Sequence, residues 1–175
     1  MLEGKTVNLR LREKEDMPLF TEWNNNLEFF GEFMWFPQVS RAEREKRYDA
    51  LTSDTKMFFI EKKDGTKIGH VIHFLSGNFM EIGYALIPSE RRKGYCTEAV
   101  RIIVDYLFLS RELRRIQAQT DPRNIASQKV LEKAGFKKEG TLRKSYFLRG
   151  EWADGLIYSI LLEEWKEPKI LTKTT

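Results

Sequence analysis

The first half of the chain carries short stretches in which apolar and polar residues alternate, the pattern of a half-buried strand. Residues 5–12 alternate in this way, and residues 57–62 lead through a glycine-containing turn at 63–66 into a similar stretch at 68–75. Residues 79–87 follow another short turn. Short turns between such stretches are a hairpin signal. We therefore expect three consecutive antiparallel strands between residues 57 and 87.

Apolar spacing and capping residues predict four helices, over residues 15–26, 41–51, 97–108 and 124–134. Ser40 and Glu43 have the spacing of a capping box at the start of the second helix. Asn124 is placed to cap the fourth helix, and Gly135 stands just past its end.

Three more strand-like stretches lie at residues 115–120, 140–148 and 152–162, and the last two form a hairpin about Arg149-Gly150. Antiparallel strands followed by strand–helix units imply a mixed sheet with helices on its faces. The sequence thus predicts an α+β fold, with a mostly antiparallel sheet of seven strands and about four helices. We expect one domain, with a core over residues 5–166 and a tail over 167–175.

Composition is that of a globular chain. Of its 175 residues, 41% are hydrophobic and 32% charged, and no apolar run approaches the roughly 18 residues of a membrane span. The first twelve residues lack the apolar core of a secretory signal. Cys96 is the single cysteine, so an intrachain disulfide is impossible. We expect a cytoplasmic protein that does not bind membranes.

The net charge of +4 is compatible with an ordinary solvated surface or with an anionic ligand. Nucleic acid is the weaker candidate, because basic and acidic residues are interspersed and no continuous basic face is evident. The one compact basic cluster is Arg91-Arg92-Lys93, beside Gly94. That arrangement favours a small phosphate ligand.

The informative stretch runs from Glu81 to Ala99. A strand ends near Ile87, Pro88 stops it, and a basic loop precedes a helix that begins near Thr97. Such a loop directs backbone N–H groups and the positive end of the helix dipole at one point, which suits a pyrophosphate. A basic turn that only caps a helix is the alternative. The pattern is neither a nucleotide P-loop nor a dinucleotide fingerprint.

Three motifs together resemble the GNAT superfamily of acetyltransferases. The loop Arg91-Arg92-Lys93-Gly94-Tyr95-Cys96 is similar to the family's phosphate loop, with cysteine where the family has glycine or alanine. Residues 121–136, from Asp121-Pro-Arg-Asn124 to Gly135-Phe136, resemble a second family segment. Residues 150–165 are similar to the branch that acetylates the N-terminal alanine or serine of ribosomal proteins. The resemblance spans Val7 to Trp165.

The resemblance implies acetyl-CoA as cosubstrate, bound where the fourth and fifth strands of the fold separate. There the family's strand pairs with the pantetheine arm, as an added strand would. It also implies a homodimer through the C-terminal strands. The residues expected to bind the cosubstrate are Ala85, Leu86, Ile87, Arg91, Arg92, Lys93, Gly94, Tyr95, Cys96, Thr97, Asn124, Ser127 and Lys133.

Acetyl transfer requires a neutral amine, stabilisation of charge on the carbonyl oxygen and protonation of the leaving thiolate. By the resemblance, Ser127 or Tyr146 is the candidate acid, and Glu81 is the candidate base acting through water. A backbone N–H near Leu86 or Ile87 is the candidate for the oxyanion. Each residue also has an ordinary structural role open to it, and positioning alone can supply much of the rate.

The acceptor side is predicted at the aromatic segment 29–36, together with the last hairpin. Phe33, Trp35 and Trp152 are candidates for substrate contact, and Glu28 and Glu32 for attracting a cation. An α-amine has a lower pKa than a lysine-type amine, which favours a peptide N-terminus. A polyamine, an aminoglycoside and a non-catalytic acetyl-CoA-binding module remain alternatives.

Two other chemistries are disfavoured. Cys96 has no histidine near it in sequence to make it a nucleophile. His70 and His73 are three residues apart on one predicted strand, so they are expected on opposite faces. No metal site is therefore predicted.

Overall fold

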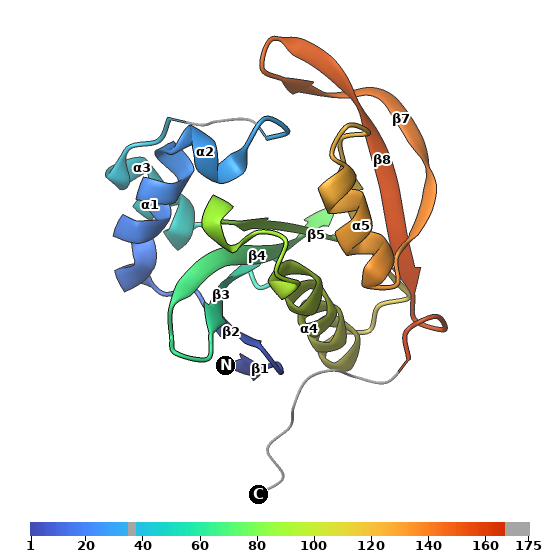
Figure 1. Cartoon of the computed structure of the whole chain (residues 1–175), viewed down its shortest axis with the longest axis horizontal. Coiled ribbons are helices and arrows are strands. Elements are labelled where there is room, and N and C mark those ends of the chain that lie inside the picture. Colours follow the sequence, from blue (N-terminus) through green and yellow to red (C-terminus); the bar gives the residue numbers. More distant parts are fainter. Residues whose placement is uncertain (35–37, 167–175) are drawn as a thin grey trace, which may run out of the picture.

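The computed structural model describes residues 1–34 and 38–166, which form one mixed sheet with helices on both faces (Figure 1). The strands are β1 (Leu2–Glu3), β2 (Val7–Leu11), β3 (Lys56–Lys62), β4 (Lys67–Ser76), β5 (Phe79–Leu86), β6 (Arg115–Thr120), β7 (Lys137–Leu148) and β8 (Glu151–Leu161). The helices are α1 (Met17–Asn25), α2 (Leu27–Phe30), α3 (Arg41–Asp49), α4 (Tyr95–Ser110) and α5 (Ile125–Lys133). Short 3-10 turns cover Lys14–Asp16 and Pro88–Glu90.

The sheet has eight strands in the order β1-β2-β3-β4-β5-β6-β8-β7, one more than expected. The additional strand, β1, has two residues, and Leu2 pairs with Leu9 of β2. Two residues are too few for an alternating pattern, so this strand has no sequence signal of its own. The predicted class, a mixed and mostly antiparallel α+β sheet, is confirmed.

β5 and β6 form the one parallel pair in the described sheet, and they stay paired over two positions only. Met80 pairs with Ile116 and Glu81 with Gln117. Beyond these residues β5 continues beside β4 alone, as far as Leu86. The sheet therefore opens between β5 and β6 at the end of β5 that leads into the basic loop.

One face of the sheet is covered by α4 and α5 (Figure 1). The predicted apolar stripe of α4 is buried as expected, with Val100, Ile103, Val104 and Leu107 each at most 2% exposed. Met80, Ile82 and Leu86 of β5 pack into the same core. Burying large side chains on both elements is the main force that holds the helix on the sheet.

The opposite face carries a smaller core beneath α1 and α2. It contains Phe20, Trp23, Phe29, Met57 and Phe59, and α3 packs against α1. The histidines divide as predicted between the two faces. His70 contacts Phe20 and Phe29 on this side, whereas His73 contacts Phe58 and Tyr106 on the side of α4.

The helix ends follow the predicted caps with one difference. Ser40 and Glu43 form the capping box of α3, and the Asn124 side chain accepts a hydrogen bond from the N–H of Ser127. However, α4 begins at Tyr95, two residues before the predicted start. Gly94 has a φ of 87° and itself serves as the N-cap, so the helix starts directly behind the glycine.

β7 and β8 form a long hairpin that arches away from the rest of the sheet (Figure 1). Leu142 pairs with Gly155 and Tyr146 with Ala153, so three residues of β7 lie opposite one residue of β8. Lys144, in the middle of this bulge, has a φ of 50°. Bulges bend a strand and re-aim its side chains, which here turns Tyr146 towards the loop after β6.

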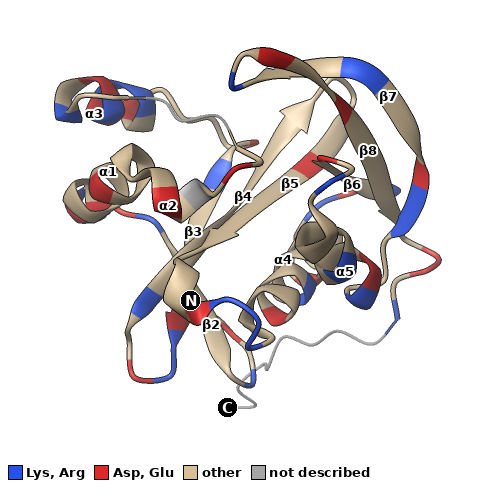
Figure 2. Cartoon of the chain, turned by 45° about the horizontal axis from the view of Figure 1, so that its top comes forward, with Lys and Arg blue, Asp and Glu red and all other residues tan. Residues whose placement is uncertain are grey.

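Charged residues of both signs are mixed over the visible surface, most clearly along α3 and the β7–β8 hairpin (Figure 2). Among the described helices, none is long and apolar enough to cross a membrane. The described residues also contain no group of three or more His, Cys, Asp or Glu side chains that could hold a metal.

Candidate active site

The loop between β5 and α4 has the backbone of an anion-binding turn. Arg92 and Gly94 both have positive φ, 64° and 87°, and no side chain caps the first turn of α4. A Cβ placed on Gly94 would meet no atom within 4 Å, so the space in front of the loop is open. Uncapped N–H groups at the start of a 16-residue helix fit a pyrophosphate. The loop therefore fits the phosphates of coenzyme A.

Arg91 uses its guanidinium within the protein. Its Nε donates to the carbonyl of Leu86 at 3.1 Å, and its Nη2 donates to the carbonyls of Glu28 and Phe29. The expectation that this side chain contacts phosphate is at odds with these bonds. Arg91 instead ties the end of β5 and the basic loop to α2.

The other predicted loop residues remain around the opening. Lys93 pairs with Glu90 at 3.0 Å and is half-exposed. Tyr95 and Cys96 are partly buried against the core. Burial raises the pKa of the Cys96 thiol to about 12, so the thiol stays protonated at neutral pH. This disfavours a thiolate nucleophile at Cys96.

The exposed edge of β5 presents the backbone of Leu86. The N–H of Ile87 donates to Ile68 of β4 at 2.9 Å. Because neighbouring residues of a strand turn their N–H groups to opposite edges, the N–H of Leu86 faces the gap beside β6. Of the two expected oxyanion donors, Ile87 is thus engaged within the sheet and Leu86 faces the opening.

Ser127 lies across this opening, in the first turn of α5. Its hydroxyl is 2.9 Å from the hydroxyl of Tyr84, which is also 3.2 Å from the Ser127 carbonyl. Asn124 holds the same turn by accepting from the N–H of Ser127 at 3.0 Å. Burial, and then the neighbouring Cys96, raise the pKa of Tyr84 far above its usual value. Tyr84 therefore keeps its proton and can act as a donor to Ser127.

The sequence analysis did not select Tyr84 as a site residue, because an aromatic residue in an apolar strand is ordinarily interpreted as part of the core. Its position on the strand nevertheless indicated which face of the sheet its side chain occupies. It faces the same side of β5 as Ile82 and Leu86, which is the side that α5 covers.

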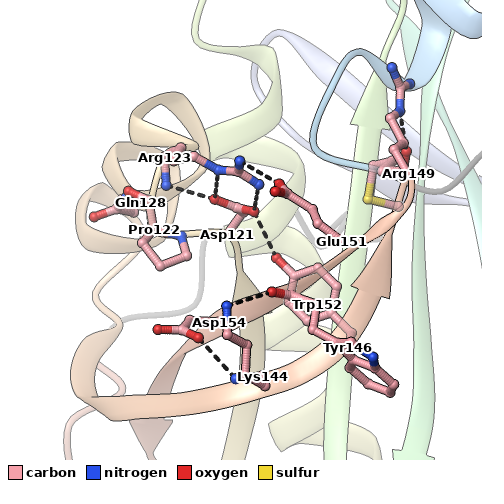
Figure 3. A network of polar contacts seen from close by, with 11 residues as sticks. Asp121, Pro122, Arg123, Gln128, Lys144, Tyr146, Arg149, Glu151, Trp152 and Asp154 are labelled. Carbon is pink, nitrogen blue, oxygen red and sulfur yellow. Dashed lines mark hydrogen bonds and ion pairs between the residues drawn. The ribbon is translucent and has the colours of Figure 1, made fainter.

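A polar network joins the loop after β6 to the last hairpin (Figure 3). Asp121 is buried, and Arg123 binds both of its carboxylate oxygens, at 2.9 Å and 2.7 Å. The other side of the Arg123 guanidinium donates to Glu151 at 2.7 Å. Tyr146 donates its hydroxyl to Asp121 at 3.2 Å. These contacts fix Tyr146 and commit its proton to a carboxylate.

The Arg123 hydrogen bonds lower the pKa of Asp121, although burial acts in the opposite direction. Burial, and then the charge of Asp121, raise the pKa of Tyr146 above its usual value. At neutral pH the network therefore contains a carboxylate, a guanidinium and a neutral phenol.

The segment after α2 is held against the same hairpin. Arg149 donates to the carbonyl of Met34 at 3.2 Å and to that of Gly31. The Phe33 ring lies 5.8 Å from the Arg123 guanidinium. These contacts bring the segment and the hairpin side by side, and an acceptor pocket between them stays a prediction. Trp35 lies outside the described residues.

Other predicted acceptor residues are more dispersed. Glu28 and Glu32 are exposed. Trp152 pairs across the hairpin with Phe147, on the opposite face from Tyr146, and is 57% exposed. The register thus places Trp152 and Tyr146 on opposite faces of the hairpin, and contact of Trp152 with the acceptor stays a prediction.

The remaining candidates lie at the edges of the opening. Glu81 accepts a hydrogen bond from Gln117 at 3.0 Å, at the last point where β5 and β6 pair. Lys133 ends α5, six residues or about 9 Å beyond Ser127. Its carbonyl accepts from Arg101 of α4, which brings a second basic residue to that position.

Comparison with known proteins gives a consistent result. Residues 6–137 match the model of the acetyltransferase (GNAT) domain. The probable N-acetyltransferase YjcK of Bacillus subtilis is 36% identical over 178 residues, covering 92% of this chain and 97% of that protein.

Two solved structures have similar folds. The ribosomal-protein-S5-alanine acetyltransferase of Vibrio fischeri superposes with a TM-score of 0.83 at 25% identity, covering 95% of this chain and 100% of that one. The spermidine N-acetyltransferase of Vibrio cholerae, in complex with CoA and spermine, gives a TM-score of 0.82 at 22% identity, covering 91% and 97%. The chain thus belongs to the GNAT family and is an acetyl-CoA-dependent N-acetyltransferase.

Proposed function

We propose that the acceptor is the N-terminal amine of a peptide or protein, which attacks acetyl-CoA directly in a ternary complex. The observation that carries this choice is the charge balance of the polar network around the hairpin. Two of its carboxylates, Asp121 and Glu151, are already bonded to the guanidinium of Arg123, and a third, Asp154, accepts from the backbone N–H of Lys144. A polycation gains little from carboxylates that already have cationic neighbours.

The open edge of β5 supports a position for the cosubstrate. When bound, acetyl-CoA supplies an activated acetyl group between β5 and α5. The phosphate loop would hold its phosphates, and the pantetheine arm would run beside Ala85 and Leu86. The N–H of Leu86 would face the acetyl carbonyl oxygen and stabilise the charge that develops there.

Ser127 is the acid we propose for the leaving thiolate. The hydroxyls of Tyr84 and Ser127 lie 2.9 Å apart, and either can donate in this bond. We assign Tyr84, which remains protonated, as the donor during the reaction, so that the serine's own proton is available to the sulfur. Tyr146 is less suitable because its proton already bonds to Asp121. We assign Tyr146 the role of holding the loop after β6 against the hairpin.

Glu81 is the proposed base, acting through water on the incoming ammonium group. Its carboxylate stands at the fork between β5 and β6, where Gln117 holds it. An α-amine needs a weaker base than a lysine-type amine, because its pKa of about 7.7–8.0 is already close to neutral. A single half-buried carboxylate is sufficient for that task.

The relatives make polyamine acetylation the second candidate. A spermidine N(1)-acetyltransferase of Escherichia coli is 24% identical over 94% of this chain. The exposed Glu28 and Glu32 are the residues here that favour a cation. A homodimer through the C-terminal strands and a cytoplasmic location stay predictions from the sequence.

The test is an acceptor panel in which thiol release from acetyl-CoA is measured. One peptide is assayed with a free and with a blocked N-terminus, beside spermidine and an aminoglycoside. We expect the free peptide to give the highest kcat/KM, with a rate that rises with pH towards the amine's pKa. A blocked peptide or spermidine that is the better substrate would refute the assignment.

A further inference from the structure

One arginine of the phosphate loop reaches a helix that is distant in sequence. Arg91 precedes Gly94 in the loop, and its guanidinium crosses to α2, where Nη2 donates to the carbonyls of Glu28 and Phe29. Its Nε donates to the carbonyl of Leu86, at the end of β5. The loop, the open edge of β5 and α2 therefore meet at one side chain, although α2 lies 62 to 63 residues away in the chain.

α2 depends on such contacts because it is a single turn. It has four residues, Leu27–Phe30, and an isolated helix of that length is not stable in water. Asn26 caps its start, and the buried ring of Phe29 stacks on Trp23 with 5.0 Å between ring centres. The last carbonyls of a helix have no partner within it, and Arg91 donates to two of those in α2.

A second arginine holds the chain just beyond α2. Arg149, in the turn of the last hairpin, donates to the carbonyls of Gly31 and Met34. A Cβ placed on Gly31 would lie 3.8 Å from Nη1 of Arg91, so both arginines approach the same glycine. Two guanidinium groups thus hold four carbonyls between residues 28 and 34. Bonds to carbonyls fix the path of the backbone, whatever the side chains are.

Occupancy of the phosphate loop should restrict Arg91 and, through it, α2. Phosphates bound to the N–H groups at the start of α4 would hold the backbone that carries Arg91. A side chain on a fixed backbone loses less freedom when it bonds to α2, so the two events stabilise each other. Such coupling is reciprocal, because a ligand that orders α2 then strengthens binding at the loop by the same factor.

We propose that Arg91 is a positioning residue that couples acetyl-CoA binding to the order of α2 and of residues 31–34. The inference rests on the proposed function in one respect, since that function places the acceptor side at this segment. Arg91 thereby raises the affinity for the acceptor once acetyl-CoA is bound, without contacting the amine. Its bonds to carbonyls, rather than its charge near the phosphates, carry this role.

Hydrogen exchange of single amides, read by NMR, measures the coupling without any acceptor. The N–H groups of Phe29 and Gly31 are the reporters, because each closes the turn of α2 by a bond of 3.2 Å. Exchange at residues 27–34 and at residues 94–98 is compared with and without saturating CoA. In wild type we expect CoA to slow exchange in both segments, by about fivefold or more at the two reporters.

Arg91→Met locates the effect. CoA is raised in the variant until residues 94–98 are protected, and we expect residues 27–34 to gain no protection. Arg92→Met is the matched control, because Arg92 is the next residue of the loop and is exposed. In that protein CoA should protect α2 as it does in wild type.

Three exchange results overturn the proposal. The first is that CoA leaves α2 unprotected in wild type, and the second is that it protects α2 equally in Arg91→Met. The third is that residues 94–98 of Arg91→Met stay unprotected at every CoA concentration, because Arg91 then acts on the cosubstrate itself. Equal loss of α2 protection in Arg92→Met has the same consequence, since any change in the loop would then suffice.

Kinetics extend the test to the acceptor. For whichever of the free peptide and spermidine is acetylated, Arg91→Met should raise the acceptor KM at saturating acetyl-CoA about five- to tenfold. The dissociation constant of CoA alone should change by less than about threefold, because no acceptor is present to be coupled. An unchanged acceptor KM overturns the proposal. If neither amine is acetylated, the acceptor assignment fails, whereas hydrogen exchange still decides the role of Arg91.

Discussion

The two halves of the active site are built in different ways. The phosphate loop is one continuous stretch, in which β5, the turn and the start of α4 follow one another within twenty residues. The proposed acceptor side combines the segment after α2, the loop after β6 and the tip of the β7–β8 hairpin, which Arg149 and Arg123 hold together. Backbone geometry dominates the first half, and long-range side-chain contacts dominate the second.

The largest effect is expected from Gly94→Asp. A left-handed φ of 87° disfavours a side chain there, and the new carboxylate would repel phosphate. We expect at least a 100-fold loss of acetyl-CoA affinity, measured by calorimetry or by loss of the ligand-induced rise in melting temperature.

Gly65→Asp is the matched control for that experiment. Gly65 has a φ of 83° and open space around it, but it lies in the β3–β4 turn. Its replacement carries the same backbone strain and should leave acetyl-CoA binding unchanged. Normal binding by Gly94→Asp would show that the loop is not the phosphate site.

The sequence predicts the local half of the site better than the distributed half. The sequence alone shows a glycine, a basic cluster and a helix start within a few residues of one another. The start of α4, directly behind Gly94, could therefore be predicted to within two residues. Even there the bonds of Arg91 to Glu28 and Phe29 could not be predicted, because they join segments about 60 residues apart. Composition cannot distinguish a ligand-binding arginine from one that binds backbone carbonyls.

The acceptor half shows the same limit more strongly. Pairing of Tyr146 with Asp121 depends on the β7 bulge, which admits three residues opposite one. A change of register by one residue exchanges the two faces of a strand. The sequence marks Tyr146 and Trp152 as hairpin aromatics, but only the register shows that they face opposite sides.

The second largest effect is expected from Ser127→Ala. If Ser127 protonates the thiolate, kcat should fall by about 10²–10⁴ while acetyl-CoA affinity stays within a factor of about two. Steady-state kinetics with a calorimetric dissociation constant separate the two quantities. Tyr146→Phe is the comparison, and it should lower kcat much less.

The double variant of Ser127 and Tyr146 tests whether either hydroxyl matters. Near-normal kcat in that protein would show that positioning of the two substrates is sufficient for the rate.

Breaking the contact between the two acceptor segments should have a moderate effect. Arg149→Met removes the bonds to the carbonyls of Gly31 and Met34, so the segment after α2 loses one anchor on the hairpin. We expect the acceptor KM to rise about tenfold, with acetyl-CoA affinity unchanged. Arg143→Met, an exposed arginine on the same hairpin, is the control. An unchanged KM for every acceptor would remove Arg149 from the acceptor side.

The smallest effect is expected from Tyr84→Phe. Tyr84 connects the two halves of the site, because it lies on β5 and its hydroxyl bonds to Ser127 of α5. Losing one hydrogen bond that orients the serine should lower kcat about three- to tenfold, with little change in either KM. The raised pKa keeps the phenol neutral across the assay range, so the wild-type rate should show no limb from its ionisation below pH 10. In a Ser127→Ala background, Tyr84→Phe should have no further effect, because the group that it positions is gone. A full additional loss in that background would mean that Tyr84 acts on the substrates directly.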